Sequence, residues 1–195
     1  PYGAYVTTGV LLWTAFLRVL NIPLQQLQSS RAILSKIGFP WESLLIAGWG
    51  EALVETAVYL AVIVGVYVVY EIPLMPILFA IPAILVFLLF GAAVGGLLTP
   101  FGVLYEDVPR VVTVATYLLF FLIPIVYPVP TANPGLRILL ADPVAILLVT
   151  AREVMMSQAV SHPVAAIASG SGAFFLFVLA WVTFRLSAPH LVSKL

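Results

Sequence analysis

Residues 51–70, EALVETAVYLAVIVGVYVVY, form an apolar run long enough to cross a bilayer, yet they carry two carboxylates near their start. A transmembrane helix needs about 20 predominantly apolar residues. A membrane β-strand would instead show alternating polar and apolar positions over about 10 residues. The run therefore predicts a membrane-spanning helix, and we expect this span to begin near Leu44.

The rest of the chain has the same character. Of its 195 residues, 63% are hydrophobic and 8% are charged, whereas soluble domains carry about 25% charged residues. The expected spans are residues 4–27, 44–70, 77–98, 111–129 and 168–187. The fold class is thus an all-α polytopic membrane protein, with one transmembrane domain over residues 1–195.

Three local features refine this expectation. Pro23 is expected to bend the last turns of the first span. Residues 91–96, GAAVGG, are small enough to let a neighbouring helix backbone approach closely. Between the last two spans, an apolar stretch bounded by Asp142, Pro143, Arg152 and Glu153 is too short to span comfortably, so it predicts a re-entrant or interfacial helix.

Composition excludes several function classes. The formal net charge is zero and lysine and arginine form no run, which argues against nucleic-acid binding. The chain has no cysteine, which excludes disulfides, thiolate metal sites and thiol nucleophiles. His162 and His190 are isolated from each other along the chain, so no metal site is expected.

Lysine and arginine collect on one side of the five expected spans, and cytoplasmic loops carry the excess of these residues. That side holds Arg31, Lys36, Arg110, Arg185 and Lys194. The loops around residues 29–42 and 104–111 and the C-terminus are therefore expected in the cytoplasm, with residue 1 outside. Because the chain starts at Pro1 rather than Met, we expect an upstream segment, and one more span would make six.

The loop at residues 29–42, SSRAILSKIGFPWE, predicts a short helix along the membrane surface. Gly38 suits a helix C-cap, and Pro40 resists continuation of the helix. The alternative is a plain basic loop anchored by Phe39 and Trp41. A second loop, residues 104–111 (LYEDVPRV), also combines acids, a proline and an arginine.

Arg18, Glu51 and Glu55 fall inside expected spans, where an unpaired charge is costly. Arg18 and Glu51 each lie about ten residues from the cytoplasmic ends of their spans, or roughly 15 Å. The two glutamates share a helix face through their i, i+4 spacing. These positions predict an ion pair that joins the first two spans, and a proton or cation pathway is the alternative.

Aromatic residues near the fourth span are candidates for a passage lining. Their flat faces suit sugar rings, although such residues also form lipid-facing or interfacial belts. The candidates are Tyr117, Phe120, Phe121 and Tyr127.

An ordered set of motifs resembles the permease subunit of ATP-binding-cassette exporters that move O-antigen, capsular polysaccharide or teichoic-acid polymers. The set covers nearly all of the chain: PYGAYVTTGVLLW (1–13), an aromatic-Pro-x-Glu motif (39–42), LLTPFGVLYEDV (97–108), FFLIPIVYP (120–128) and DPVAILLVTAREV (142–154). The chain departs from the family at Asp142, where the family more often has Asn, and at Trp41, where it more often has a basic or other polar residue.

The resemblance implies a homodimer of permeases bound to two ATPase subunits in a bacterial or archaeal cytoplasmic membrane. It also implies that an interfacial helix and a first span precede residue 1. The first loop would be the coupling helix that sits on the ATPase, and the second loop a smaller contact with it. The coupling residues would be Arg31, Lys36, Phe39, Pro40, Glu42, Glu106, Asp107 and Arg110.

Under this interpretation the chain itself is not an enzyme and binds no cofactor. No G-x-x-x-x-G-K-[ST] sequence occurs in it, so ATP and Mg²⁺ would bind to the partner ATPase. The expected substrate is a polysaccharide or lipid-linked glycan. Alternatives are a cassette exporter of drugs or lipids, an ion-coupled secondary transporter, and a membrane-embedded enzyme or scaffold. A secondary transporter typically has inverted repeats, and no internal repeat is visible.

Overall fold

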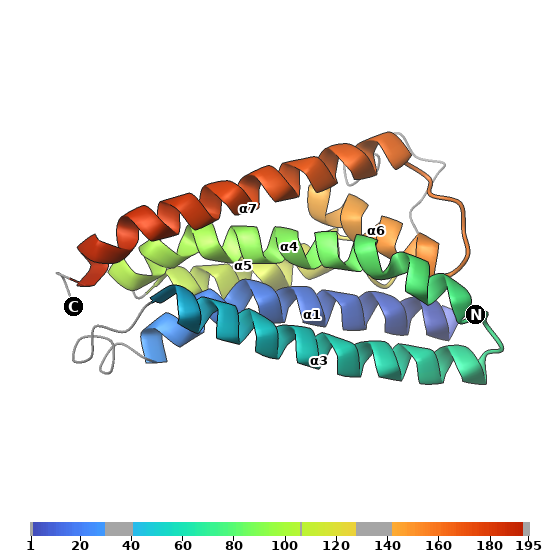
Figure 1. Ribbon diagram of the computed structural model, residues 1–195. Coiled ribbons are helices and arrows are strands. Elements are labelled where there is room, and N and C mark those ends of the chain that lie inside the picture. The colour runs from blue at the N-terminus through green and yellow to red at the C-terminus, as the bar shows by residue number, and fades with distance from the viewer. Residues whose placement is uncertain (1, 30–40, 106, 128–141, 193–195) are drawn as a thin grey trace.

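Helices supply all the regular secondary structure in the part of the chain that the computed structural model describes, residues 2–29, 41–105, 107–127 and 142–192 (Figure 1). Four of the helices are long and apolar enough to cross a membrane, and α5 is apolar but shorter. The all-α polytopic membrane fold is therefore confirmed. The helices are α1 (Tyr2–Ser29), α3 (Trp41–Val69), α4 (Met75–Leu104), α5 (Val108–Leu122), α6 (Pro143–Met155) and α7 (Pro163–Val192).

The long helices extend a few residues beyond the apolar runs that predicted them. Proline suits the first turn of a helix, and α7 begins at Pro163. α1 continues through Pro23 to Ser29. The two ends of the described chain lie at opposite ends of the bundle, as expected for an odd number of crossings (Figure 1).

α4 is the helix around which the others pack. It contacts α1, α6 and α7, while α3 packs along the other side of α1 (Figure 1). The four long helices therefore follow the spatial order α3, α1, α4, α7. α6 lies among α4, α7 and α1, and most of its residues are buried.

The small residues of α4 let α1 approach closely, as predicted. A Cβ atom on Gly95 would collide with the backbone carbonyl of Leu20, and one on Gly91 would come within 3.0 Å of the Phe16 ring. The Phe16 and Phe87 rings stack with centroids 4.8 Å apart. Such small-residue contacts are a main source of helix association in lipid, where no hydrophobic force drives helices together.

α5 is shorter than predicted. The apolar sequence suggested a span over residues 111–129, but the helix ends at Leu122 and Ile123 adopts an extended backbone (φ −77°, ψ 139°). The cause is Pro124, because a proline disfavours helical geometry at the preceding residue and has no N–H to donate. A helix of this length rises about 22 Å, less than the roughly 30 Å of a bilayer core.

The break after α5 leaves backbone carbonyls without helical partners, and side chains from other helices satisfy three successive ones. Arg152 Nη1 donates to the Ile125 carbonyl at 3.1 Å. The Tyr2 hydroxyl donates to that of Val126 at 3.2 Å, and the Tyr5 hydroxyl to that of Tyr127 at 3.1 Å. In lipid every such group needs a partner, so these contacts make the break tolerable.

Arg152 belongs to the buried core of the protein. Its side chain is buried, with the guanidinium carbon 3.7 Å from the centre of the Tyr5 ring. Glu153 instead accepts hydrogen bonds from the backbone N–H and hydroxyl of Ser161. Gly9 permits the arrangement, because a Cβ there would lie 2.5 Å from the Ile125 carbonyl oxygen.

The apolar stretch after residue 142 is a helix, as predicted, and its start is capped. The Asp142 carboxylate accepts a hydrogen bond from the Val144 N–H at 3.0 Å. Burial raises the pKa of this carboxyl above its usual value, although the hydrogen bond opposes the shift. α6 thus begins with a partly buried acid that serves as its N-cap.

The contact between α1 and α4 can be tested with two neighbouring glycines. We expect Gly95→Ala to destabilise the protein by about 1–3 kcal/mol, because the added methyl group meets rigid backbone. Gly96→Ala should change stability by no more than about 0.5 kcal/mol, since its Cβ would lie 3.4 Å from Ala180 Cβ, an ordinary contact. Thermal unfolding in detergent measures both, and equal stabilities would contradict the packing described.

Candidate functional site

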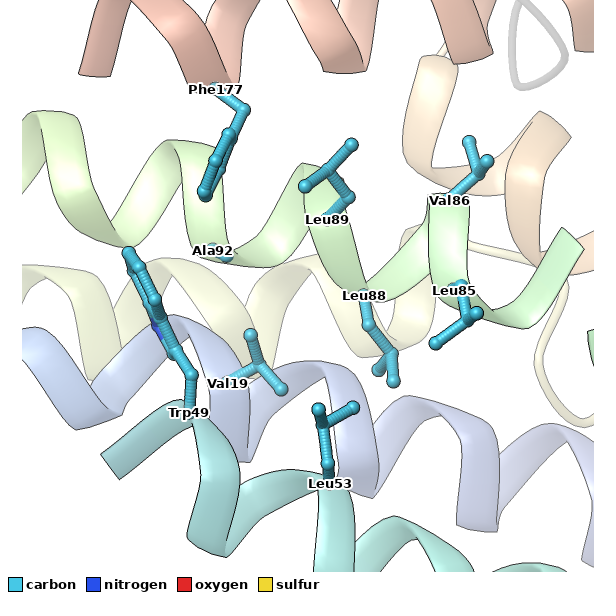
Figure 2. A pocket seen from close by; sticks show the side chains of 9 residues that line it. All are labelled: Val19, Trp49, Leu53, Leu85, Val86, Leu88, Leu89, Ala92 and Phe177. Atoms are coloured by element: carbon cyan, nitrogen blue, oxygen red, sulfur yellow. The ribbon is translucent and has the colours of Figure 1, made fainter. Parts of the chain in front are cut away.

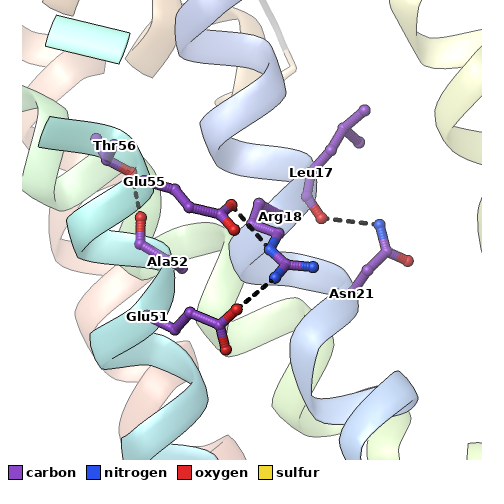
Figure 3. A network of polar contacts seen from close by, with 7 residues as sticks. All are labelled: Leu17, Arg18, Asn21, Glu51, Ala52, Glu55 and Thr56. Carbon is purple, nitrogen blue, oxygen red and sulfur yellow. Dashed lines mark hydrogen bonds and ion pairs between the residues drawn. The ribbon is translucent and has the colours of Figure 1, made fainter. Parts of the chain in front are cut away.

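The three charged residues predicted inside the spans come together in the structure. Arg18 of α1 lies between Glu51 and Glu55 of α3 (Figure 3). Its Nη2 is 2.9 Å from Glu51 Oε1, and its Nε is 2.9 Å from Glu55 Oε2. The predicted ion pair between the first two spans is thus present, and it includes both glutamates.

This charge cluster lies far from either end of its helices. Arg18 is roughly 24 Å from the start of α1 and 16 Å from its end at 1.5 Å per residue. Glu51 and Glu55 lie roughly 15 and 21 Å from the start of α3. A bilayer core is about 30 Å thick, so a chain that crosses it with these helices holds the cluster near mid-depth.

The cluster is paired but not enclosed. The side chains of Arg18, Glu51 and Glu55 are 33%, 58% and 35% exposed. One guanidinium faces two carboxylates, so the cluster has one more anion than cation. Charged groups within membrane spans typically face a bundle interior or a water-filled cavity. This surface of the chain is therefore better suited to water or another polar surface than to lipid.

Arg18 belongs to a polar stripe along α1. Its members are three, four or seven residues apart, so they share one side of the helix, and each is half-buried or exposed. From first to last they cover roughly 27 Å at 1.5 Å per residue, close to the thickness of a bilayer core. The polar stripe consists of Thr7, Thr14, Arg18, Asn21 and Gln25.

The opposite side of α1 faces the core. Trp13, Phe16 and Leu20 are buried there, and Phe16 and Leu20 lie against α4. Thr14 and Asn21 donate to backbone carbonyls of their own helix, at 2.8 Å in each case. The polar stripe is therefore directed outward, and these two members need no contact with another helix.

Three of the predicted aromatic residues lie on the neighbouring helix α5. Phe120 contacts Trp13 of α1, with ring centroids 6.5 Å apart, and Phe121 packs edge-on against Phe120. Tyr117 lies one turn before Phe121, and both are exposed. The aromatic edge of α5 thus borders α1, while α3 flanks α1 with the two glutamates.

Tyr127 has a different environment from the other three. Its hydroxyl donates to the carbonyl of Leu122 at 2.7 Å, near the end of α5. This bond satisfies one of the carbonyls that a helix C-terminus leaves without a partner. Tyr127 is therefore part of the break after α5.

The charged end of the bundle, defined by Glu42, Asp107, Arg110 and Arg185, holds the described part of the predicted coupling surface. Arg110 pairs with Asp107 at 3.3 Å, and both are exposed. Arg185 Nε lies 3.9 Å from Glu42 Oε1. The other predicted coupling residues lie outside the described residues: Arg31, Lys36, Phe39, Pro40 and Glu106.

Two features of the site were not predicted from the sequence. The polar stripe could have been predicted, since its members recur at helical spacing within an otherwise apolar span. The proximity of Arg185 to Glu42 has none, because these residues are far apart in the chain. Within the described ranges, no group of three or more histidine, aspartate or glutamate side chains is arranged to hold a metal ion.

Comparison with known proteins adds no relative. No protein-family model matches the chain, and no curated protein matches it.

The ion pairs can be tested by a double-mutant cycle. We expect Arg18→Leu to lower stability and yield, because it leaves two carboxylates unpaired among apolar helices. Adding Glu55→Leu should recover part of the loss, and adding Glu51→Leu should recover less, since Glu51 is more exposed. Coupling of about 0.5–3 kcal/mol is expected from thermal unfolding in detergent. If neither double variant exceeded Arg18→Leu, the cluster would have no stabilising role.

Proposed function

We propose that this chain is the permease subunit of an ATP-binding-cassette exporter that moves a polysaccharide or lipid-linked polymer across the cytoplasmic membrane of a bacterium or archaeon. The observation that carries the proposal is the outward-facing polar stripe of α1, with the charge cluster near mid-depth and the aromatic edge of α5 packed against α1. Together these form one wall of a hydrated passage. The proposal of this family rests on the ordered motifs of the sequence.

The chemistry of this wall suits a glycan. Threonine, asparagine and glutamine side chains exchange hydrogen bonds with sugar hydroxyls. Tyr117, Phe120 and Phe121 offer ring faces against which the apolar faces of sugars pack. Such contacts are individually weak, and a polymer must advance along its passage without being trapped.

One chain supplies only one wall, so the passage needs a second. We propose that two copies face each other across their polar stripes and that each binds one ATPase subunit at its charged end. The exposed Asp107 and Arg110 and the partly buried Glu42 are available for charge-assisted contacts there. Nucleotide-driven movement of the ATPases would reach the membrane helices through α3, whose first turn carries Glu42.

One observation favours a second candidate, an ion-coupled transporter. The charge cluster has one carboxylate more than it has cations, and intramembrane carboxylates are common in proton relays. In this alternative, collapse of the proton gradient stops transport while ATP remains available. In the exporter, transport continues until ATP is depleted.

The exporter proposal is tested by expressing the chain together with the ATPase encoded beside it. We expect a complex with two copies of each subunit by light scattering. Glu42→Ala should weaken ATPase binding by about tenfold or more, because a hydrogen bond to a charged group contributes about 1.5–3 kcal/mol. Pro40→Gly should reduce export by relaxing the joint before α3.

The control for Glu42→Ala is Glu71→Ala, an exposed glutamate in the turn just beyond the other end of α3. It should bind the ATPase normally. A monomeric permease active in export would overturn the proposal, as would normal ATPase binding and export by a Pro40→Gly, Glu42→Ala double variant.

A further inference from the structure

An apolar groove lies between α3 and α7, over α4 (Figure 2). It consists of two cavities of about 330 and 350 Å³, both lined by Trp49 and Phe177. Trp49 is two residues from Glu51, and residues two apart on a helix point in nearly opposite directions. The groove and the charge cluster thus occupy different surfaces of the molecule.

Aromatic side chains divide the groove. The Trp49 ring lies 5.6 Å from that of Phe177 and 6.4 Å from that of Trp181, measured between centroids. One cavity extends from these rings toward Leu85 of α4, and the other includes Trp181. The contacting rings separate two open cavities that adjoin them, so an elongated apolar molecule lying across both cavities fits better than a compact one.

The groove borders the two least covered of the four long helices. In their most apolar stretches, only 22% of α3 and 11% of α7 is buried in the protein, against 50% of α1 and 44% of α4. Because these helix surfaces are apolar and lie within the membrane, they contact the hydrocarbon chains of lipids. An open apolar cavity on such a surface is filled by a lipid acyl chain.

A positively charged residue, Arg185, lies next to one end of the groove. Arg185 is one turn beyond Trp181 on α7, on the same side of the helix and nearer the charged end. Its side chain is 74% exposed, and its Nε lies 3.9 Å from Glu42 Oε1. A guanidinium has five N–H donors in a fork that matches phosphate, so Arg185 has donors to spare.

We propose that the groove binds one phospholipid of the leaflet at the charged end. Its phosphate contacts Arg185, and one acyl chain runs past Trp181 and over the contacting rings of Trp49 and Phe177. A phospholipid supplies what both parts of the site require, an anion at the membrane surface and a flexible apolar chain directly below it. This inference does not depend on the proposed function.

Charge argues against a second copy as the occupant. A second copy would have to bring its own carboxylate to Arg185 and an elongated apolar side chain to the cavities. A phospholipid has both groups in the correct order along its length. The site would anchor α7 to α3 where their own side chains leave a gap.

The test measures binding of phosphatidylglycerol to the purified protein by native mass spectrometry. We expect Arg185→Gln to weaken binding by about fivefold, since a basic residue contributes about 1 kcal/mol to anionic-lipid binding. Arg185→Lys should retain most of it. Glu42→Gln removes the same ion pair but leaves the cation, so it should bind at least as well as the unchanged protein.

Two leucines on α4 provide a matched steric test. Leu85 lines the cavity, whereas Leu78, seven residues earlier and also largely exposed, lines neither cavity. Leu85→Trp should reduce lipid binding severalfold by filling the groove, and Leu78→Trp should not. In vesicles of acyl-brominated phosphatidylglycerol, fluorescence quenching should fall when Trp49 is replaced by Phe.

Three results would overturn the proposal. In the first, Glu42→Gln weakens lipid binding as much as Arg185→Gln, which would give Arg185 only a structural role. In the second, Leu85→Trp and Leu78→Trp bind lipid equally. In the third, Leu85→Trp abolishes dimerisation without affecting lipid binding, which would identify a second copy as the occupant.

Discussion

The close approach of α1 to α4 determines what the rest of the molecule presents to its surroundings. Gly95 allows the α4 backbone to reach the Leu20 carbonyl, and Phe16 stacks on Phe87 beside it. The polar stripe of α1 lies on the opposite side of the helix, so this packing directs Arg18 outward. α3 then brings two carboxylates to Arg18, and α5 packs its aromatic rings against α1.

A second constraint is that polar groups need partners where water is scarce. The chain meets it in two ways. Arg18 is paired with two carboxylates from the adjacent helix, and the break after α5 is satisfied by side chains from α1 and α6. The first arrangement remains partly exposed, which suits a surface that contacts a hydrated substrate. The second centres on the buried Arg152, which suits a structural role.

Much of this fold could be predicted from the sequence, because long apolar runs are stable in lipid as helices. The distances of Arg18, Glu51 and Glu55 from the ends of their spans were enough to predict that they pair. The break after α5 was not predicted, since residues 120–129 are as apolar as a span and only Pro124 and Pro128 interrupt them. The contacts of Arg152 could not be predicted either, because they join residues distant in the chain. Which side of α1 faces outward required the packing against α4.

The central claim, that the polar stripe of α1 borders water within the membrane, is tested most directly by cysteine accessibility. The chain has no cysteine of its own, so single cysteines at Thr14 and Asn21 can be compared with one at Phe175, an exposed position on α7. In proteoliposomes of the assembled protein, a membrane-impermeant thiol reagent should modify the first two and not the third. Protection of Thr14→Cys and Asn21→Cys, with the reactivity of Phe175→Cys, would contradict the account.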